Sequence, residues 1–170
     1  MFNLDNGNLN MAEIKTEIPW DTYEKYAQIY LDRDIFKGTP MTGKMLRDAA
    51  EETYKRTGKY VPLDLALSQG QMESKMGLLS RNASTNPFNV GEYDAGTTIK
   101  FPDTQTGVNA YYDLMARRYL AKQDYKGLLT NFVNDEGNRY ASNPNYEKMI
   151  SGQINVIRDY VDNVTGARRK

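Results

Sequence analysis

Apolar residues that recur every three or four positions constrain the fold of this 170-residue chain more than any other feature. This spacing places side chains on one face of an α-helix, and that face must be buried against other elements. Cap residues, glycines and prolines mark where each apolar run starts and stops. The pattern predicts helices at about 19–31, 42–58, 62–77 and 103–121, a short one around 128–133, and a last one from 143 onward.

Each predicted helix has an expected buried stripe. In the second helix, Thr42 is the expected cap and the stripe runs from Met45 to Tyr54. The short helix carries Leu128, Leu129, Phe132 and Val133. In the last helix, Asn143 is the expected cap, and the stripe is Tyr146, Met149, Ile150, Ile157, Tyr160 and Val161. The fold class that follows is mainly α, with a small β component (α+β).

Residues 81–102 interrupt the helical pattern. They are rich in asparagine and glycine and end in a β-prone run at 97–101. We expect a long loop with a small hairpin there, and loops of this length are usually functional. The organisation that follows is a flexible or partner-dependent arm at 1–17, a single domain at 18–165 and a basic tail at 166–170.

The composition removes several classes of chemistry. The chain has no histidine and no cysteine, which excludes Ser-His-Asp triads, Cys-His pairs and nearly all catalytic zinc sites. Acid–base chemistry must then come from Asp, Glu, Tyr or Lys. Because Lys+Arg and Asp+Glu are equal at 22 each, no electrostatic argument for a nucleic-acid partner exists. No segment approaches the roughly 20 apolar residues of a membrane span, and the polar N-terminus does not read as a signal peptide.

Glu73 stands out on the third predicted helix. Leu63, Ala66 and Gly70 line one face of that helix, and the same spacing puts Glu73 on or beside it. Burial raises the pKa of a glutamate above its usual value of about 4.3, and a carboxylic acid that stays protonated suits general-acid cleavage of a glycosidic bond. Gly70 and Gly77 are expected to leave space for a bulky substrate. The alternative is a glutamate at the helix border, paired with a lysine or arginine.

Four blocks of sequence resemble, in order, the glucosaminidase family of peptidoglycan hydrolases. In the first, an alanine-containing helix leads into Glu73-Ser74, with Gly77 three residues on, as in the family's catalytic helix. The stretch Thr-Asn-Pro-Phe-Asn-Val-Gly at 85–91 looks like its substrate-groove loop. The other two blocks are Phe101 with 107–112, similar to a Phe-x-x-Tyr segment, and 139–146, similar to a Tyr-Ala-x-Asp-Pro-x-Tyr segment.

The resemblance implies a lysozyme-like fold, a helical domain with a small β-lobe or loop flanking a substrate cleft. It implies an endo-β-N-acetylglucosaminidase-like enzyme that cleaves β-1,4 bonds of bacterial peptidoglycan and needs neither cofactor nor metal. Glu73 would be the general acid, and Tyr140 would line the cleft and support the reacting sugar. The residues implied in substrate binding are Asn86, Phe88, Asn89 and Tyr112. For Phe88 and Tyr140, plain core packing is the alternative.

The chain departs from the family pattern at the second acid. Some members carry one in the β-lobe, where this chain has Thr-Thr-Ile-Lys at 97–100. Glu92, Asp94 and Asp103 are nearby candidates for a second carboxylate, and none matches the position well. Cleavage assisted by the substrate's own N-acetyl group, or lytic transglycosylation, therefore stays open. At the family's Asp position in the fourth block stands Asn143, which caps a helix as well as Asp does.

Other functions fit the same residues. The protein could be a muramidase or a lytic transglycosylase on the same substrate, or a lysozyme-like structural component of a phage particle or secretion machine. The arm at 1–17 would then dock it to virion or secretion-apparatus proteins. Without a recognisable signal peptide, a phage-encoded protein is expected, either virion-associated or held in the host cytoplasm before release to the cell wall. A bacterial protein exported by a dedicated apparatus would look the same.

Overall fold

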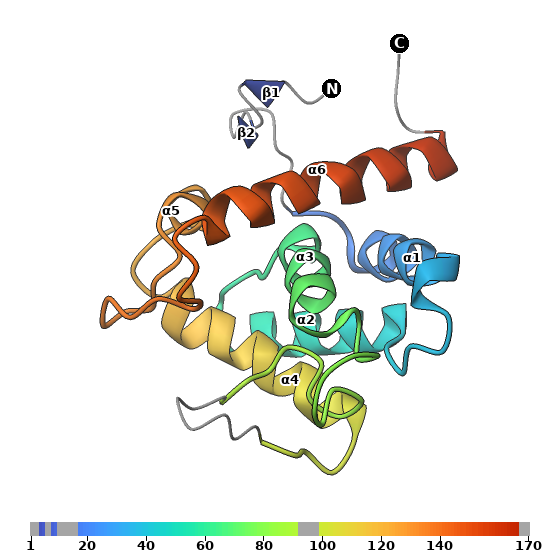
Figure 1. Cartoon of the computed structure of the whole chain (residues 1–170), viewed down its shortest axis with the longest axis horizontal. Helices are drawn as coiled ribbons and strands as arrows, with labels where there is room; N and C mark the ends of the chain where they lie inside the picture. Colours follow the sequence, from blue (N-terminus) through green and yellow to red (C-terminus); the bar gives the residue numbers. More distant parts are fainter. Residues whose placement is uncertain (1–3, 6–7, 10–16, 92–98, 167–170) are drawn as a thin grey trace.

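The computed structural model describes residues 4–5, 8–9, 17–91 and 99–166. Within these ranges the chain is mainly helical, which confirms the predicted mainly-α class (Figure 1). The strands β1 (Leu4–Asp5) and β2 (Asn8–Leu9) pair in antiparallel register. The helices are α1 (Trp20–Leu31), the 3₁₀ turn η2 (Asp34–Phe36), α2 (Gly43–Thr57), α3 (Leu63–Ser74), α4 (Thr104–Leu114), the π-helical turn η3 (Met115–Tyr119), α5 (Tyr125–Thr130) and α6 (Tyr146–Thr165).

The hairpin expected near residues 97–101 falls partly on 92–98, outside the described residues. The described part, 99–101, forms no strand. The structure describes β pairing elsewhere: between β1 and β2 within the predicted N-terminal arm, and in an isolated antiparallel bridge between Val133 and Arg139. Most of that arm and residues 167–170 of the predicted basic tail also lie outside the described residues.

Side-chain caps fix where several helices start. The Thr42 hydroxyl accepts the backbone N–H of Met45 at 3.1 Å and so caps α2, as predicted. Gly58, with φ +75°, ends the same helix in the left-handed conformation. Asp103 caps α4 in the same way, through the N–H of Thr106 at 2.8 Å. Local chemistry therefore accounts for these boundaries.

Helix α3 lies at the centre of the molecule (Figure 1). It packs against α6 and α1, and its residues are buried on nearly every side rather than along one stripe. A helix that is apolar or neutral all round is typical of such a core position. The buried residues of α3 are Leu63, Leu65, Ala66, Leu67, Ser68, Gln69, Gly70 and Ser74. The helix ends at Ser74 rather than at Gly77, because the backbone turns left-handed at Lys75.

The predicted stripes were wrong at a few border positions. On α2 the side chain that completes the buried face is Thr53, whereas Tyr54 is 42% exposed and rests beside Trp20. On α6 Met149 is 46% exposed, because its neighbour Ile150 takes the inward position. Helix α5 ends at Thr130, before Phe132, although the Phe132 ring is buried in the core as expected.

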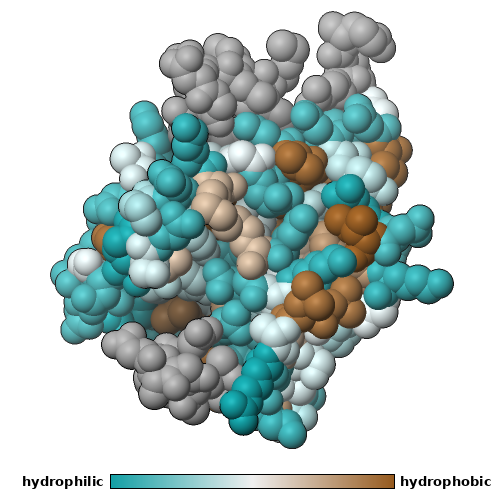
Figure 2. Space-filling view, viewed as in Figure 1, coloured by the Kyte–Doolittle hydropathy of each residue, from teal (hydrophilic) through white to brown (hydrophobic). Residues whose placement is uncertain are grey.

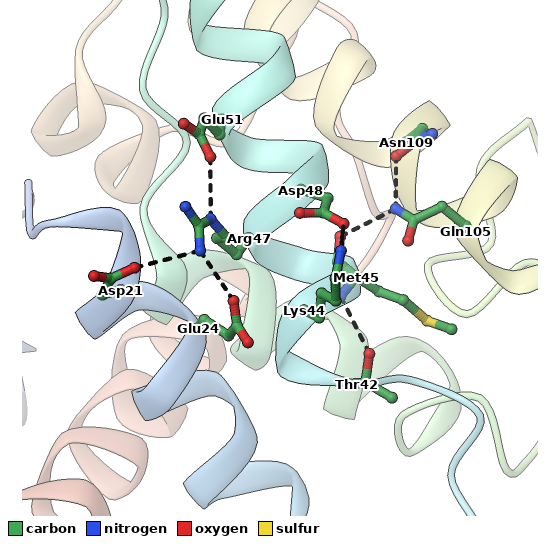
Figure 3. A network of polar contacts seen from close by, with 10 residues as sticks. All are labelled: Asp21, Glu24, Thr42, Lys44, Met45, Arg47, Asp48, Glu51, Gln105 and Asn109. Atoms are coloured by element: carbon green, nitrogen blue, oxygen red, sulfur yellow. Dashed lines mark hydrogen bonds and ion pairs between the residues drawn. The ribbon is translucent and has the colours of Figure 1, made fainter.

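A polar network ties α2 to its neighbours α1 and α4 (Figure 3). The Arg47 guanidinium on α2 reaches Asp21 at 3.4 Å and Glu24 at 3.2 Å on α1, as well as Glu51 on its own helix. From α4, the Gln105 amide donates to the backbone carbonyl of Met45 at 3.1 Å. Surface ion pairs of this kind contribute little each, so the network orients the helices more than it stabilises them.

The contact between α3 and α6 includes an ion pair. Arg158 of α6 donates through Nε to Asp64 at the start of α3, and the Arg158 side chain is only 6% exposed. Burial raises the pKa of Asp64, and the Arg158 charge opposes that rise. The Ser68 hydroxyl adds a bond to the Ile150 carbonyl at 3.3 Å. These contacts hold the long C-terminal helix against the central one.

The surface carries apolar side chains in small separate patches (Figure 2). The large ones that are exposed among the described residues are Ile35, Tyr54, Leu79, Met149, Val156 and Val164. Scattered exposure of this kind is ordinary for a folded protein. None of the described helices combines the length and the apolar character needed to span a membrane.

Candidate active site around Glu73

Glu73 lies at the end of α3, where the buried helix reaches the surface, and it is partly exposed. The Tyr146 hydroxyl, from the start of α6, lies 3.2 Å from Glu73 Oε2. The Asn89 amide donates to the Glu73 backbone carbonyl at 2.9 Å and lies 3.5 Å from Oε1. The partners that the structure describes for Glu73 thus include a phenol and a carboxamide.

A buried chain of hydrogen bonds leads to this carboxylate. Tyr111 Oη donates to Gln69 Oε1 at 2.5 Å, and Gln69 Nε2 donates to Tyr146 Oη at 3.0 Å. Burial raises the pKa of Tyr111 and of Tyr146, and the negative charge of Glu73 raises that of Tyr146 further. Both phenols therefore stay protonated near neutral pH and can donate hydrogen bonds.

Sequence reasoning missed Gln69, Tyr111 and Tyr146 as parts of the site. A signal for Gln69 is present, because it lies one helical turn before Glu73 and therefore on the same side of the helix. Tyr146 closes the fourth block of the resemblance but was read as a core residue. Both side chains are in fact buried and polar, and such groups are bonded to a partner.

The turn after Glu73 is held in an unusual conformation. Lys75, Met76 and Gly77 follow one another with φ of +52°, +59° and +85°. Left-handed backbone costs about 1 kcal/mol at a non-glycine residue and persists only where surroundings enforce it. The buried Ser74 hydroxyl does so here: it accepts the Gly77 N–H at 2.8 Å and donates to the Pro87 carbonyl at 2.6 Å. Ser74 therefore fastens the loop at 85–91 to the end of α3.

Asn86 and Phe88 shape this loop from inside. The Asn86 side chain accepts the Val90 N–H at 2.9 Å and donates to the carbonyls of Val90 and Ile99. Phe88 stacks on Tyr111, with ring centroids 3.8 Å apart. Both side chains are fully buried, so neither can contact a sugar in this structure. The expected substrate contacts of Asn86 and Phe88 are corrected to roles in loop packing.

Tyr112 needs the same correction. It is fully buried, and its hydroxyl lies 2.8 Å from that of Tyr23, which in turn donates to the Val61 carbonyl. These contacts place Tyr112 in the core between α1 and α4, out of reach of a substrate. Of the four residues expected to bind substrate, Asn89 alone lies at Glu73 with a partly exposed side chain. Its φ of +53° is one that asparagine tolerates better than most residues.

Tyr140 lies beside the site. Its ring is nearly parallel to that of Tyr146, with centroids 5.9 Å apart, and its hydroxyl donates to the Phe88 carbonyl at 3.0 Å. The neighbouring Arg139 binds Glu147 with two bonds of 2.7 and 2.9 Å. This hydrogen-bonded pair lowers the pKa of Glu147 to about 2. The Tyr140 segment is thereby fixed to the start of α6.

Contrary to the prediction, Asn143 does not cap α6. Its side-chain oxygen accepts the N–H of Asn145 at 2.8 Å, which closes a turn ahead of the helix. The cap position belongs to Asn145, whose side chain makes no capping bond. The proline at 144 precedes the helix rather than opening it.

The candidates for a second carboxylate fall in two places. Asp103 is exposed and occupied as the cap of α4, where bonds from the Thr106 hydroxyl and N–H lower its pKa. Glu92 and Asp94 lie outside the described residues. We therefore assign no second acid.

The glycines near Glu73 do not open space for a substrate. A Cβ at Gly70 would lie 3.1 Å from Met76 Sδ and 3.2 Å from the Phe88 ring. A Cβ at Gly77 would lie 3.1 Å from Pro40. Protein atoms fill both positions, so these glycines allow close packing around the end of α3.

A separate surface groove of about 390 Å³ lies between α2 and α4. Its lining residues, several of which are drawn in Figure 3, are Asp48, Glu51, Glu52, Lys55, Gln105 and Asn109. None of them was predicted as a site residue. Across the described part of the chain, no group of acidic side chains is arranged to hold a metal ion.

No protein-family model matches this chain, and no curated protein matches it. The assignment of the site therefore depends on the residues around Glu73 and on the sequence resemblance.

Proposed function

We propose that the protein cleaves β-1,4 glycosidic bonds in the glycan strands of peptidoglycan, with Glu73 as general acid. The observation that carries the proposal is the setting of Glu73. It is a partly exposed carboxyl group at the end of a buried helix that accepts a hydrogen bond from Tyr146. Asn89 donates to the Glu73 backbone carbonyl, with its amide 3.5 Å from the carboxyl oxygen Oε1. The sequence resemblance supplies the substrate class and favours the bond that follows N-acetylglucosamine.

The chemistry follows from where charge develops. Glu73 would give its proton to the glycosidic oxygen as the bond to the sugar breaks. Negative charge then grows on its carboxylate, and the bond from Tyr146 strengthens because charge-assisted hydrogen bonds are stronger than neutral ones. Interactions that strengthen in the transition state accelerate the reaction. Tyr140, held parallel to Tyr146, would flank the reacting sugar.

The experiment is digestion of purified peptidoglycan sacculi, with the released muropeptides identified by mass spectrometry. The wild-type protein should release fragments, and Glu73→Gln should release almost none. Glu136→Gln is a matched control, because Glu136 is an exposed glutamate that pairs with Arg118 and makes no described contact with Glu73. It should digest like the wild type.

The products name the reaction. A reducing N-acetylglucosamine end identifies a glucosaminidase, a reducing N-acetylmuramic acid end a muramidase, and an anhydro end a lytic transglycosylase. If the wild type releases nothing from sacculi of several wall types, the enzyme proposal fails. Undiminished release by Glu73→Gln would refute the role of that residue.

A further inference from the structure

The hydrogen-bonded chain from Tyr111 to Glu73 crosses three helices. Tyr111 comes from α4, Gln69 from α3 and Tyr146 from α6, with donor–acceptor distances of 2.5 and 3.0 Å before the last step of 3.2 Å to Glu73. Tyr111 and Gln69 are fully buried, and Tyr146 is 3% exposed. Water therefore has little access to the chain, and each member depends on the next for its hydrogen bond.

This chain has a direction. A carboxamide accepts at its oxygen and donates at its nitrogen, and a phenol has a single proton. When Tyr111 donates to the Gln69 oxygen, the Gln69 nitrogen faces Tyr146 and donates to it. The Tyr146 proton is then free to point at Glu73, which accepts it best as a carboxylate.

The reverse direction is also possible, but at a cost. If the Gln69 amide turned over, Tyr146 would donate to Gln69 and could only accept from Glu73, which would have to be protonated. The Tyr111 hydroxyl would then accept a bond, and its own proton would lose the partner that it has in this structure, in a fully buried position. A buried donor without a partner is unfavourable. Tyr111 thus disfavours the direction that goes with protonated Glu73.

We propose that Tyr111, acting through Gln69, fixes the direction in which Tyr146 donates and so sets how tightly Glu73 holds its proton. Tyr111 is a positioning residue, since it is separated from the carboxylate by two intervening side chains. Its effect on the protonation of Glu73 is independent of the substrate. The consequence for catalysis rests on the proposed function.

Three phenols in and around the chain stay neutral over the range in which a glutamate titrates. Burial raises the pKa of Tyr111 on α4, Tyr119 on η3 and Tyr146 on α6. All three phenols therefore stay protonated up to at least the usual tyrosine pKa of about 10. The nearest acid on α6, Glu147, is held as a carboxylate by Arg139 from the preceding loop. Further neighbours among the described residues are Tyr140 in that loop and the exposed Lys75 on the turn after Glu73.

The test is a pH titration of the full-length protein with ¹³C-labelled glutamate, following the Glu73 side-chain carboxyl signal by NMR. Glu73→Gln identifies the signal by its loss. Tyr146→Phe removes the donor, and Tyr111→Phe removes the group that sets its direction while keeping the ring stacked on Phe88. Each variant should raise the proton affinity of Glu73, by up to about tenfold.

Tyr125→Phe is the matched control. Its hydroxyl is buried, and the structure describes no hydrogen-bond partner for it. Tyr125→Phe also removes a buried hydroxyl group, but it leaves the hydrogen-bonded chain intact. The titration of Glu73 should therefore be unchanged. An unchanged titration in Tyr111→Phe would overturn the proposal, and so would an equal shift in Tyr125→Phe. If Tyr111→Phe does not fold, the titration of Tyr146→Phe decides: no shift there also overturns the proposal.

Activity on sacculi separates this proposal from the proposed function. If the protein is active, the alkaline limb of its pH–rate profile should move to higher pH in Tyr111→Phe, because the acid form of Glu73 survives to higher pH. If the titrations shift but the protein cleaves nothing, the role of the hydrogen-bonded chain is supported and the proposed glycosidase function fails. If the protein is active but the titrations do not shift, the glycosidase function is supported and the role of Tyr111 fails.

Discussion

At the scale of single residues, Glu73 lies where a buried helix reaches the surface, and its carboxyl group accepts a hydrogen bond from Tyr146. Asn89 adds a donor whose main bond is to the Glu73 backbone carbonyl. The carboxyl group is thus held in place from α6 and from the loop at 85–91.

Ser74 is the residue whose loss should loosen this arrangement most directly. In Ser74→Ala, the Gly77 N–H and the Pro87 carbonyl both lose their buried partner. We expect the free energy of unfolding, from urea denaturation at pH 7, to fall by about 1–3 kcal/mol. Ser142→Ala, at an exposed position, should stay within about 0.5 kcal/mol of the wild type. Equal stability of the two variants would contradict the role given to Ser74.

At the scale of elements, an ion pair ties the Tyr140 segment to the start of α6. The bidentate bond between Arg139 and Glu147 also includes the Phe132 N–H, which donates to Glu147 at 2.8 Å. Since the Glu147 side chain is only 15% exposed, solvent screens this pair less than an ordinary surface pair. The pair therefore fixes the loop that ends at α6.

The ion pair makes a pH-dependent contribution to stability. The pKa of Glu147 is about 2 in the folded protein, below its unfolded value, so its contribution is present above about pH 5 and is lost as the pH falls toward 2. We expect urea denaturation to show a loss on the order of 2 kcal/mol over that range, and less of it in Glu147→Gln. Glu136→Gln, at an exposed pair, should keep the wild-type slope. Identical slopes for all three proteins would show that Glu147 contributes nothing.

The contact between α4 and the loop at 85–91 leaves no room for a side chain. A Cβ at Gly107 would lie 1.9 Å from the Thr85 carbonyl oxygen. Gly107→Ala must therefore displace the loop, and we expect a loss of about 1–3 kcal/mol, seen as a lower melting temperature. Gly152→Ala on α6 meets nothing within 4 Å and should be neutral or slightly stabilising. A normal melting temperature for Gly107→Ala would contradict this packing.

Helices were predictable from the sequence because their signals are local. The Thr42 cap, the Gly58 stop and the apolar period each involve only a few consecutive residues. The orientation of three expected substrate-binding residues, two in the loop at 85–91 and one on α4, is not predictable in that way. Asn86, Phe88 and Tyr112 are polar or aromatic residues that could face either a substrate or the core, and contacts with distant segments decide which.

At the scale of the whole molecule, the long C-terminal helix completes the site. Helix α6 packs along α3, is bonded to its start through Arg158 and Asp64, and brings Tyr146 to its end beside Glu73. The sequence showed that both helices exist, but the Tyr146–Glu73 contact joins residues that lie 73 positions apart. Only the packing of α3 inside the molecule brings them together.

The role proposed for Glu73 is to supply the proton that breaks a glycosidic bond. We would measure the initial rate of reducing-end release from one sacculus preparation for the wild type and for Glu73→Gln. Both proteins would first be shown to have the same melting temperature. Loss of a general acid should lower the rate by roughly 10²- to 10⁴-fold. A Glu73→Gln protein that folds normally and retains the wild-type rate would contradict the account.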